Sequence, residues 1–264
     1  ILDSVASMTG VKRKLADWSI AVGLQTVPYR QRSQDLPFML GLKYKIADKL
    51  VLNKFRAALG GKVRACSSGG SALSKEVGSF FCGIGITIIE GYGLTETSPV
   101  MTVGHTDFFK FGTVGKPIPG VEVKIQPDGE IVCRGHNVMM GYYKNEEATN
   151  EAIIDGWFHS GDIGEFDEDG LLRITDRKKS LIVTSGGKNV APQPMEVSLT
   201  SNKYIEQCNI VGDDRNFISA LIVPSKENLL AWAEEQGLAS LDYDALCAHD
   251  QTYDHYDAIV KTVM

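Results

Sequence analysis

The stretch Ile84-Gly-Ile-Thr-Ile-Ile-Glu-Gly-Tyr-Gly-Leu-Thr-Glu-Thr97 decides the fold class of this 264-residue chain. Its first part, Ile84 to Ile89, is rich in β-branched residues and predicts a short strand that ends in a glycine loop. Upstream, a strand-like run from Val63 to Cys66 ends in a second glycine loop, Ser67-Ser-Gly-Gly-Ser71, and a helical stretch follows. This order of strand, glycine loop, helix, strand and glycine loop is typical of a parallel α/β sheet, whose strand ends bind ligands.

The residues before this region are predicted to be helical. Leu15, Trp18 and Val22 recur at the three-to-four-residue spacing of a helix face. Pro28 and Pro37 are expected to divide two helices, and Gly60-Gly61 to end the second.

After Gly112 the pattern changes to short strands separated by turn signals. Val121–Ile125 alternates in polarity and a further strand is expected from 130 to 134, which indicates a small antiparallel sheet or a distorted barrel. A charged run at 176–179 followed by Ser185-Gly-Gly187 predicts a domain boundary. We therefore expect an α/β part at 1–175 that includes a β subdomain at about 112–175, and a partial α+β domain at 176–264 with a helix from 253.

Composition excludes several classes of protein. Hydrophobic residues make up 43% and charged residues 23%, as in globular domains, and the net charge of -6 argues against a nucleic-acid binder. Five dispersed cysteines without a C-x-x-C pair indicate neither a disulfide framework nor a zinc site. The charge is uneven, because residues 1–64 hold twelve Lys and Arg against four Asp and Glu.

The glycine loop at 91–97 carries side chains suited to a nucleotide. Gly91 and its neighbour at 93 let the backbone approach a ligand, and Tyr92 offers a flat face to a base. Thr95 can donate to a phosphate oxygen, and Glu96 can give magnesium a hard oxygen ligand. The alternative is a tight turn after a buried strand, which explains the glycines but not Thr-Glu-Thr beside them.

Three motifs in order resemble the adenylate-forming superfamily. They are Tyr92-Gly-Leu-Thr-Glu-Thr97, Gly156-Trp-Phe-His-Ser-Gly-Asp162 and Thr175-Asp-Arg-Lys-Lys179. The run Ser185-Gly-Gly-Lys-Asn-Val-Ala-Pro-Gln-Pro-Met-Glu196 and the early Ser68-Gly-Gly-Ser-Ala-Leu73 most resemble the long-chain fatty acyl-CoA synthetase branch.

The resemblance implies a nucleotide site. Gly69, Gly70 and Ser71 would line the adenine, although Ser71-Ala72 stands where the family usually has Ala-Pro. Tyr92 would stack on the adenine, Thr95 would contact the α-phosphate and Glu96 would hold Mg²⁺. Asp162 would accept both ribose hydroxyls, with Arg177 beside them. Without the other motifs, the favoured interpretation of Asp162 is a capping residue in a Ser-Gly-Asp turn, and the alternative for Arg177 is a solvated basic run.

The resemblance also implies a moving part. Asp176 to Lys179 would be an exposed hinge between adenylation and thioester formation, and Gly186 and Gly187 would leave room for the pantetheine arm of CoA. The alternative interpretation of Gly186 and Gly187 is an ordinary turn.

The implied reaction is long-chain fatty acid:CoA ligation with ATP, Mg²⁺ and CoA, through an acyl-adenylate. The family's phosphate loop and its C-terminal catalytic lysine are missing from this sequence, so we expect a fragment that is inactive alone. Two other readings stay open: another adenylate-forming enzyme, such as an aryl-CoA ligase or amino-acid adenylation domain, and a non-catalytic nucleotide-binding module. We expect no nucleic-acid partner and a cytoplasmic location. We also expect weak peripheral contact with the inner membrane face through the basic residues of the first segment, Lys12, Arg13, Lys14, Lys43, Lys45 and Lys49.

Overall fold

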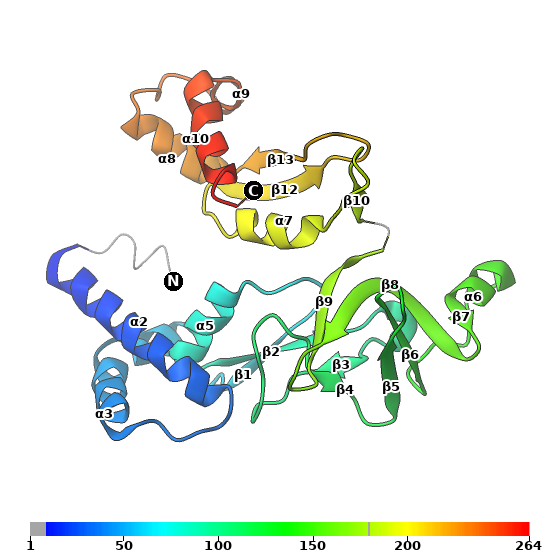
Figure 1. Cartoon of the computed structure of the whole chain (residues 1–264). Helices are drawn as coiled ribbons and strands as arrows, with labels where there is room; N and C mark the ends of the chain where they lie inside the picture. Colours follow the sequence, from blue (N-terminus) through cyan, green and yellow to red (C-terminus); the bar gives the residue numbers. More distant parts are fainter. Residues whose placement is uncertain (1–8, 179, 264) are drawn as a thin grey trace. The chain divides into compact units, whose positions relative to one another are not determined.

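The computed structural model describes residues 9–178 and 180–263 (Figure 1). The chain forms two compact units. The first holds the residues up to Ser160 together with Gly164–Ile174, and the second holds Gly161–Ile163 and the residues from Thr175 onward.

The first unit begins with helices and a sheet of mixed direction. Its elements are α2 (Gly10–Arg30), α3 (Phe38–Ala47), the π-helical segment η1 (Asp48–Leu52), α4 (Asn53–Ala58), β1 (Ala65–Ser68), α5 (Lys75–Gly83), β2 (Thr87–Tyr92), the 3₁₀ turn η2 (Thr95–Thr97), β3 (Thr102–Val103) and β4 (Lys116–Pro117). The strands lie in the order β1-β2-β3-β4. β1 and β2 are parallel, with Ala65 opposite Thr87, and this confirms the expected α/β arrangement.

The strand expected at 84–89 begins and ends three residues later than predicted. Ile84 and Ile86 still donate to Phe80 and Phe81 of α5, and Gly85 turns the chain at φ +93°. Residues 84–86 therefore complete the helix. Gly91 pairs with Val103, so it lies in β2 rather than in the loop.

α2 packs against α5 through small residues. A Cβ at Gly23 would lie 2.8 Å from the Gly83 carbonyl oxygen, and the buried side chains of α2 include Ala16 and Ser19. The apolar face predicted for this helix is wrong at Trp18, which is 38% exposed, whereas Val22 is buried as expected. The expectation that Pro28 divides the helices is also wrong: α2 continues through Pro28 to Arg30, because a proline in the last turn costs a single helical hydrogen bond.

The β subdomain is antiparallel, as expected. It contains β5 (Val121–Ile125), β6 (Glu130–Gly135), α6 (Glu146–Ala152), β7 (Ile153–Ile154), β8 (Trp157–Phe166) and β9 (Leu172–Arg177). It belongs to the first unit except for Gly161–Ile163 of β8 and the end of β9 from Thr175. The strands follow the order β5-β6-β8-β7, and β9 also pairs with β8. Its core includes Ile131, Cys133, Phe158 and Leu172, which are at most 2% exposed.

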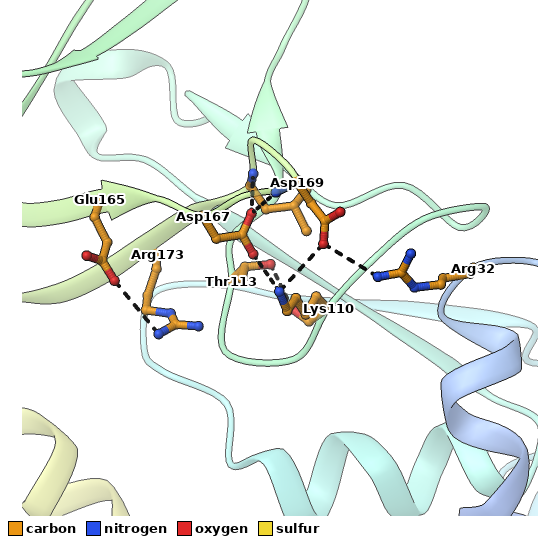
Figure 2. A network of polar contacts seen from close by, with 8 residues as sticks. Arg32, Lys110, Thr113, Glu165, Asp167, Asp169 and Arg173 are labelled. Carbon is orange, nitrogen blue, oxygen red and sulfur yellow. Dashed lines mark hydrogen bonds and ion pairs between the residues drawn. The ribbon is translucent and has the colours of Figure 1, made fainter.

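Ion pairs hold the turn between β8 and β9 to the loop between β3 and β4 and to the chain just after α2. Lys110 Nζ lies 2.9 Å from Asp167 Oδ2 and 3.6 Å from Asp169 Oδ2, and Arg32 Nη2 approaches the same Asp169 oxygen at 3.6 Å. Figure 2 shows Lys110 reaching both carboxylates. Asp167 Oδ1 also accepts from the backbone amides of Asp169 and Leu171, so one carboxylate shapes the turn and anchors it.

The second unit is a small α+β fold around a hairpin. It contains β10 (Ile182–Val183), β11 (Asn189–Val190), α7 (Pro192–Thr200), β12 (Ile205–Val211), β13 (Ser219–Pro224), α8 (Lys226–Glu235), α9 (Tyr243–Cys247) and α10 (Asp250–Val260). Helix α7 lies on one face of the antiparallel β12–β13 pair and α8–α10 on the other (Figure 1). The helix predicted from 253 begins three residues earlier, where the His249 side chain accepts from Gln251 N. In the described residues, none of the helices has both the length and the apolar content that a bilayer span requires.

Candidate nucleotide site

The two glycine loops lie side by side because β1 and β2 are parallel neighbours. A Cβ at Gly69 would lie 3.3 Å from the Gly91 carbonyl oxygen, so the backbones almost touch. Gly70 has φ +83°, a conformation that glycine adopts without strain. Gly69, Gly70 and Ser71 are exposed. The first loop therefore presents backbone and a hydroxyl group next to the second.

The second loop is tightly folded on itself. A Cβ at Gly93 would lie 1.8 Å from the Pro99 carbonyl oxygen, so only glycine fits. The buried Thr97 hydroxyl accepts from Leu94 N at 2.9 Å and donates to Leu94 O at 3.0 Å. These contacts close the turn η2, which carries Thr95 and Glu96.

The side chains of this loop differ in exposure. Tyr92 is 9% exposed and belongs to the core cluster with Met101 and Phe158, so most of its side chain is covered by the protein. Thr95 is exposed and Glu96 is half-buried. The structure thus places a hydroxyl and a carboxylate at the surface beside an anchored aromatic ring.

Asp162 and Arg177 come together in the second unit. Asp162 is 4% exposed on β8, and the Arg177 Nε atom at the end of β9 donates to its Oδ1 at 3.1 Å. The Arg177 side chain remains 66% exposed. This pair places a buried carboxylate behind an accessible guanidinium group.

The predicted hinge is described only in part. Lys179 lies outside the described residues. The expectation of an exposed hinge is wrong at Asp176, which is 2% exposed because its side chain points inward from β9. Burial raises the pKa of Asp176, against the hydrogen bond from Arg177 N, and the charge of Glu196 adds to the rise.

Gly186 and Gly187 form the exposed tip of the β10–β11 hairpin. Gly187 has φ +75° and its amide donates to Thr184 O at 2.8 Å. The Ser185 hydroxyl donates to Asn216 Oδ1, which ties the tip to the loop after β12. The tip therefore has no side chain at 186 or 187, and hydrogen bonds to Thr184 and Asn216 hold it in place.

Two residues of the site were missed by the sequence analysis. Thr97 closes the turn, and the only sequence signal was its place in Thr-Glu-Thr. Tyr142 donates from its hydroxyl to Glu96 Oε1 at 2.8 Å. It lies 46 residues away in sequence, so no local spacing could indicate this contact.

Comparisons with known proteins identify the family. The AMP-binding enzyme family matches residues 31–143, and the AMP-binding enzyme C-terminal domain matches residues 179–262. The long-chain-fatty-acid–CoA ligase FadD15 of Mycobacterium tuberculosis is 46% identical over 224 residues, which are 84% of this chain and 37% of that protein. The long-chain-fatty-acid–CoA ligase ACSBG2 of Xenopus laevis is 39% identical over 82% of this chain and 30% of its own length.

Solved structures agree with this relationship. The O-succinylbenzoate coenzyme A synthetase of Bacillus subtilis, in complex with ATP and a magnesium ion, matches 69% of this chain and 43% of its own, with 28% identity and a TM-score of 0.56. The same enzyme with its acyl-adenylate intermediate gives 27% identity and a TM-score of 0.57. The chain belongs to the AMP-binding, adenylate-forming superfamily. Within it, the curated relatives place the chain in the long-chain acyl-CoA synthetase branch, and it spans little more than a third of the length of FadD15.

Proposed function

We propose that this chain is part of a long-chain fatty acid:CoA ligase that works in two steps. A fatty carboxylate attacks the α-phosphate of ATP to give acyl-adenylate and pyrophosphate, and the CoA thiol then displaces AMP to form the thioester. The observation that carries this proposal is the paired glycine loops, with Thr95 and Glu96 presented on a turn that permits no side chain at Gly93. The 46% identity to a long-chain ligase supports the fatty-acid substrate.

Glu96 suits a magnesium ion delivered with ATP. Mg²⁺ is usually held by one or two carboxylates together with substrate phosphates and water. Glu96 supplies such a carboxylate at the surface of η2, next to the exposed Thr95 hydroxyl. The ion would neutralise phosphate charge, while Thr95 would donate to an α-phosphate oxygen and Asp162 would accept from the ribose hydroxyls.

The second step depends on the other proposed sites. We propose that the boundary between 1–175 and 176–264 is a hinge at Asp176 and Lys179, and that the hairpin tip at Gly186 and Gly187 approaches the pantetheine arm. The tip has no side chains at these two positions and is held by Thr184 and Ser185, which suits close approach to a narrow substrate.

The function is tested by measuring ATP–pyrophosphate exchange in the intact protein with different carboxylic acids as the substrate. We expect exchange with palmitate, none with benzoate or amino acids, and release of palmitoyl-CoA only when CoA is present. Exchange with aryl acids and not with palmitate would indicate an aryl-CoA ligase. The absence of both exchange and ATP binding would favour a non-catalytic module.

A membrane contact is proposed as part of the same function, because fatty acids partition into bilayers. Helix α3 exposes Phe38 (83%), Leu42 (48%) and Ile46 (47%), which are spaced four residues apart along one face. Lys45 and Lys49, each three residues from one of these side chains, are also exposed and lie beside that face. A helix with a basic and apolar surface fits the headgroup region of an anionic bilayer.

A further inference from the structure

Glu96 is held from outside its own loop by the segment between β6 and α6. The Met139 amide donates to the Glu96 carbonyl oxygen at 2.8 Å, which fixes the backbone of the turn. The Tyr142 hydroxyl donates to Glu96 Oε1, also at 2.8 Å, which fixes the carboxylate. Backbone and side chain of the same residue are therefore positioned from one segment.

That segment is itself rigidly attached to α6. Gly141 has φ +149°, and a Cβ there would lie 2.7 Å from Thr149 Cγ2. Next to it, Tyr142 N donates to Thr149 Oγ1 at 2.9 Å, and this hydroxyl donates to Asn145 O at 2.7 Å. Asn145 caps α6 by accepting from Ala148 N. The Tyr142 backbone is thus anchored independently of its hydroxyl group.

The hydrogen bond leaves Glu96 prepared for a cation. A carboxylate has two oxygens, so a donor at Oε1 sets the rotation of the group and leaves Oε2 to bind a cation. The phenol group of a tyrosine is protonated at neutral pH, so Tyr142 can donate this hydrogen bond to the carboxylate. Hydrogen bonds to metal-binding carboxylates commonly change metal affinity ten- to a hundredfold.

From this geometry we infer that Tyr142 is a positioning residue: it orients the Glu96 carboxylate for the Mg²⁺ that accompanies ATP. The inference rests on the proposed function, since Glu96 must be a magnesium ligand. If this hydrogen bond only held the two segments together, its loss would weaken ATP binding equally with and without Mg²⁺.

Calorimetric titration of ATP into the intact protein, with Mg²⁺ and with excess EDTA, tests the inference. Tyr142→Phe removes only the hydroxyl and keeps the amide bond to Thr149. We expect it to weaken ATP binding about ten- to a hundredfold with Mg²⁺ and to leave binding in EDTA unchanged. Tyr143→Phe is the matched control, because Tyr143 is 88% exposed and adjacent. It should bind as wild type in both conditions.

Glu96→Gln separates this inference from the proposed function. If Glu96→Gln reduces Mg²⁺-dependent binding and Tyr142→Phe does not, the positioning role is overturned while the metal site stands. If Glu96→Gln has no Mg²⁺-dependent effect, the metal assignment fails and the role of Tyr142 fails with it. Equal weakening by Tyr142→Phe with Mg²⁺ and with EDTA would also overturn the inference, because it would show a structural tie.

Discussion

Asp162 is buried, yet its partner Arg177 is mostly exposed, and this asymmetry makes Asp162 suitable for substitution. Removing the carboxylate charge leaves a guanidinium group that water can solvate, so folding should change little. If Asp162 accepts the ribose hydroxyls, Asp162→Asn removes charge-assisted hydrogen bonds of about 1.5 to 3 kcal/mol. We expect ATP affinity to fall about ten- to a hundredfold, measured as the KM for ATP in the exchange assay.

Glu165→Gln is the control for this prediction. Glu165 lies on the same strand, is exposed, and reaches Arg173 only at 3.8 Å. It should leave the KM unchanged. An unchanged KM in Asp162→Asn as well would remove Asp162 from the ribose site.

At the residue scale, the sequence predicted the position of a side chain correctly where the motif that carries it also forms the loop. Thr95 and Glu96 were predicted on a turn and lie on one, because the glycines that mark the motif also shape the backbone. Tyr142 was missed because its contact with Glu96 depends on how the segment before α6 folds back, which is a tertiary property. Asp176 was expected to be exposed as part of the charged hinge that the resemblance implies, whereas its place on an inward-facing strand position buries it.

At the scale of elements, a side chain should be tolerated much less well at Gly93, in the loop after β2, than at Gly91 within the strand. Gly93→Ala would place a methyl group 1.8 Å from a backbone oxygen, and the backbone cannot yield as a side-chain tip can. We expect a loss of about 1 to 3 kcal/mol or more in the free energy of unfolding, together with loss of ATP binding. Urea unfolding and calorimetry measure the two effects.

Gly91→Ala provides the comparison. The nearest atom to its Cβ would be Thr102 O at 3.4 Å, an ordinary contact. This variant should be close to wild type in stability. If both variants behave alike, close packing does not explain the glycine at 93.

The turn between β8 and β9 should make stability depend on pH. Burial raises the pKa of Asp167, but Lys110 and the amides of Leu171 and Asp169 outweigh it, so the net pKa is lowered. A carboxyl group with a lowered folded pKa adds stability above its unfolded pKa, about 3.9, and loses it as the pH falls through the folded value. Asp167→Asn should therefore be less stable than wild type near neutral pH, and the difference should disappear in acid.

Urea unfolding of both proteins from neutral pH down to about pH 2 checks this prediction. Glu168→Gln, an exposed neighbour, should show no such pH-dependent difference. A difference between Asp167→Asn and wild type that stays constant across the range would mean that the charge of Asp167 contributes nothing.

Sequence patterns predicted elements better than they predicted faces. The antiparallel strands at 121–125 and 130–135 appear within one residue of their expected bounds, because alternation and turn residues act locally. The buried face of α2 was predicted only in part: Val22 is buried as expected, but much of the face consists of small residues that allow α2 and α5 to approach through Gly23 and Gly83. Hydrophobic periodicity does not detect contacts that depend on the absence of a side chain.

At the scale of the whole molecule, the structure shows which elements expose the positive charge of the first 64 residues. Lys43, Lys45 and Lys49 are exposed on α3 and η1, where Phe38, Leu42 and Ile46 are exposed as well. On α2, by contrast, Arg13 lies 2.9 Å from Asp17, which reduces its net contribution to a positive surface. Of the basic residues expected to contact a membrane, Arg13 therefore has a weaker case than the lysines of α3 and η1.

This distribution predicts salt-sensitive binding of the intact protein to anionic vesicles through α3. Each lysine near an anionic surface contributes about 1 kcal/mol, and screening shortens its reach from about 30 Å at 0.01 M salt to about 3 Å at 1 M. Reversing Lys43, Lys45 and Lys49 to Glu should abolish co-sedimentation with phosphatidylserine vesicles at low salt. Reversal of the exposed Lys62, Lys144 and Lys188 changes the net charge equally and should retain most of the binding. Equal loss in both triple variants would show that net charge alone governs the association, and binding that high salt leaves intact would exclude an electrostatic contact at α3.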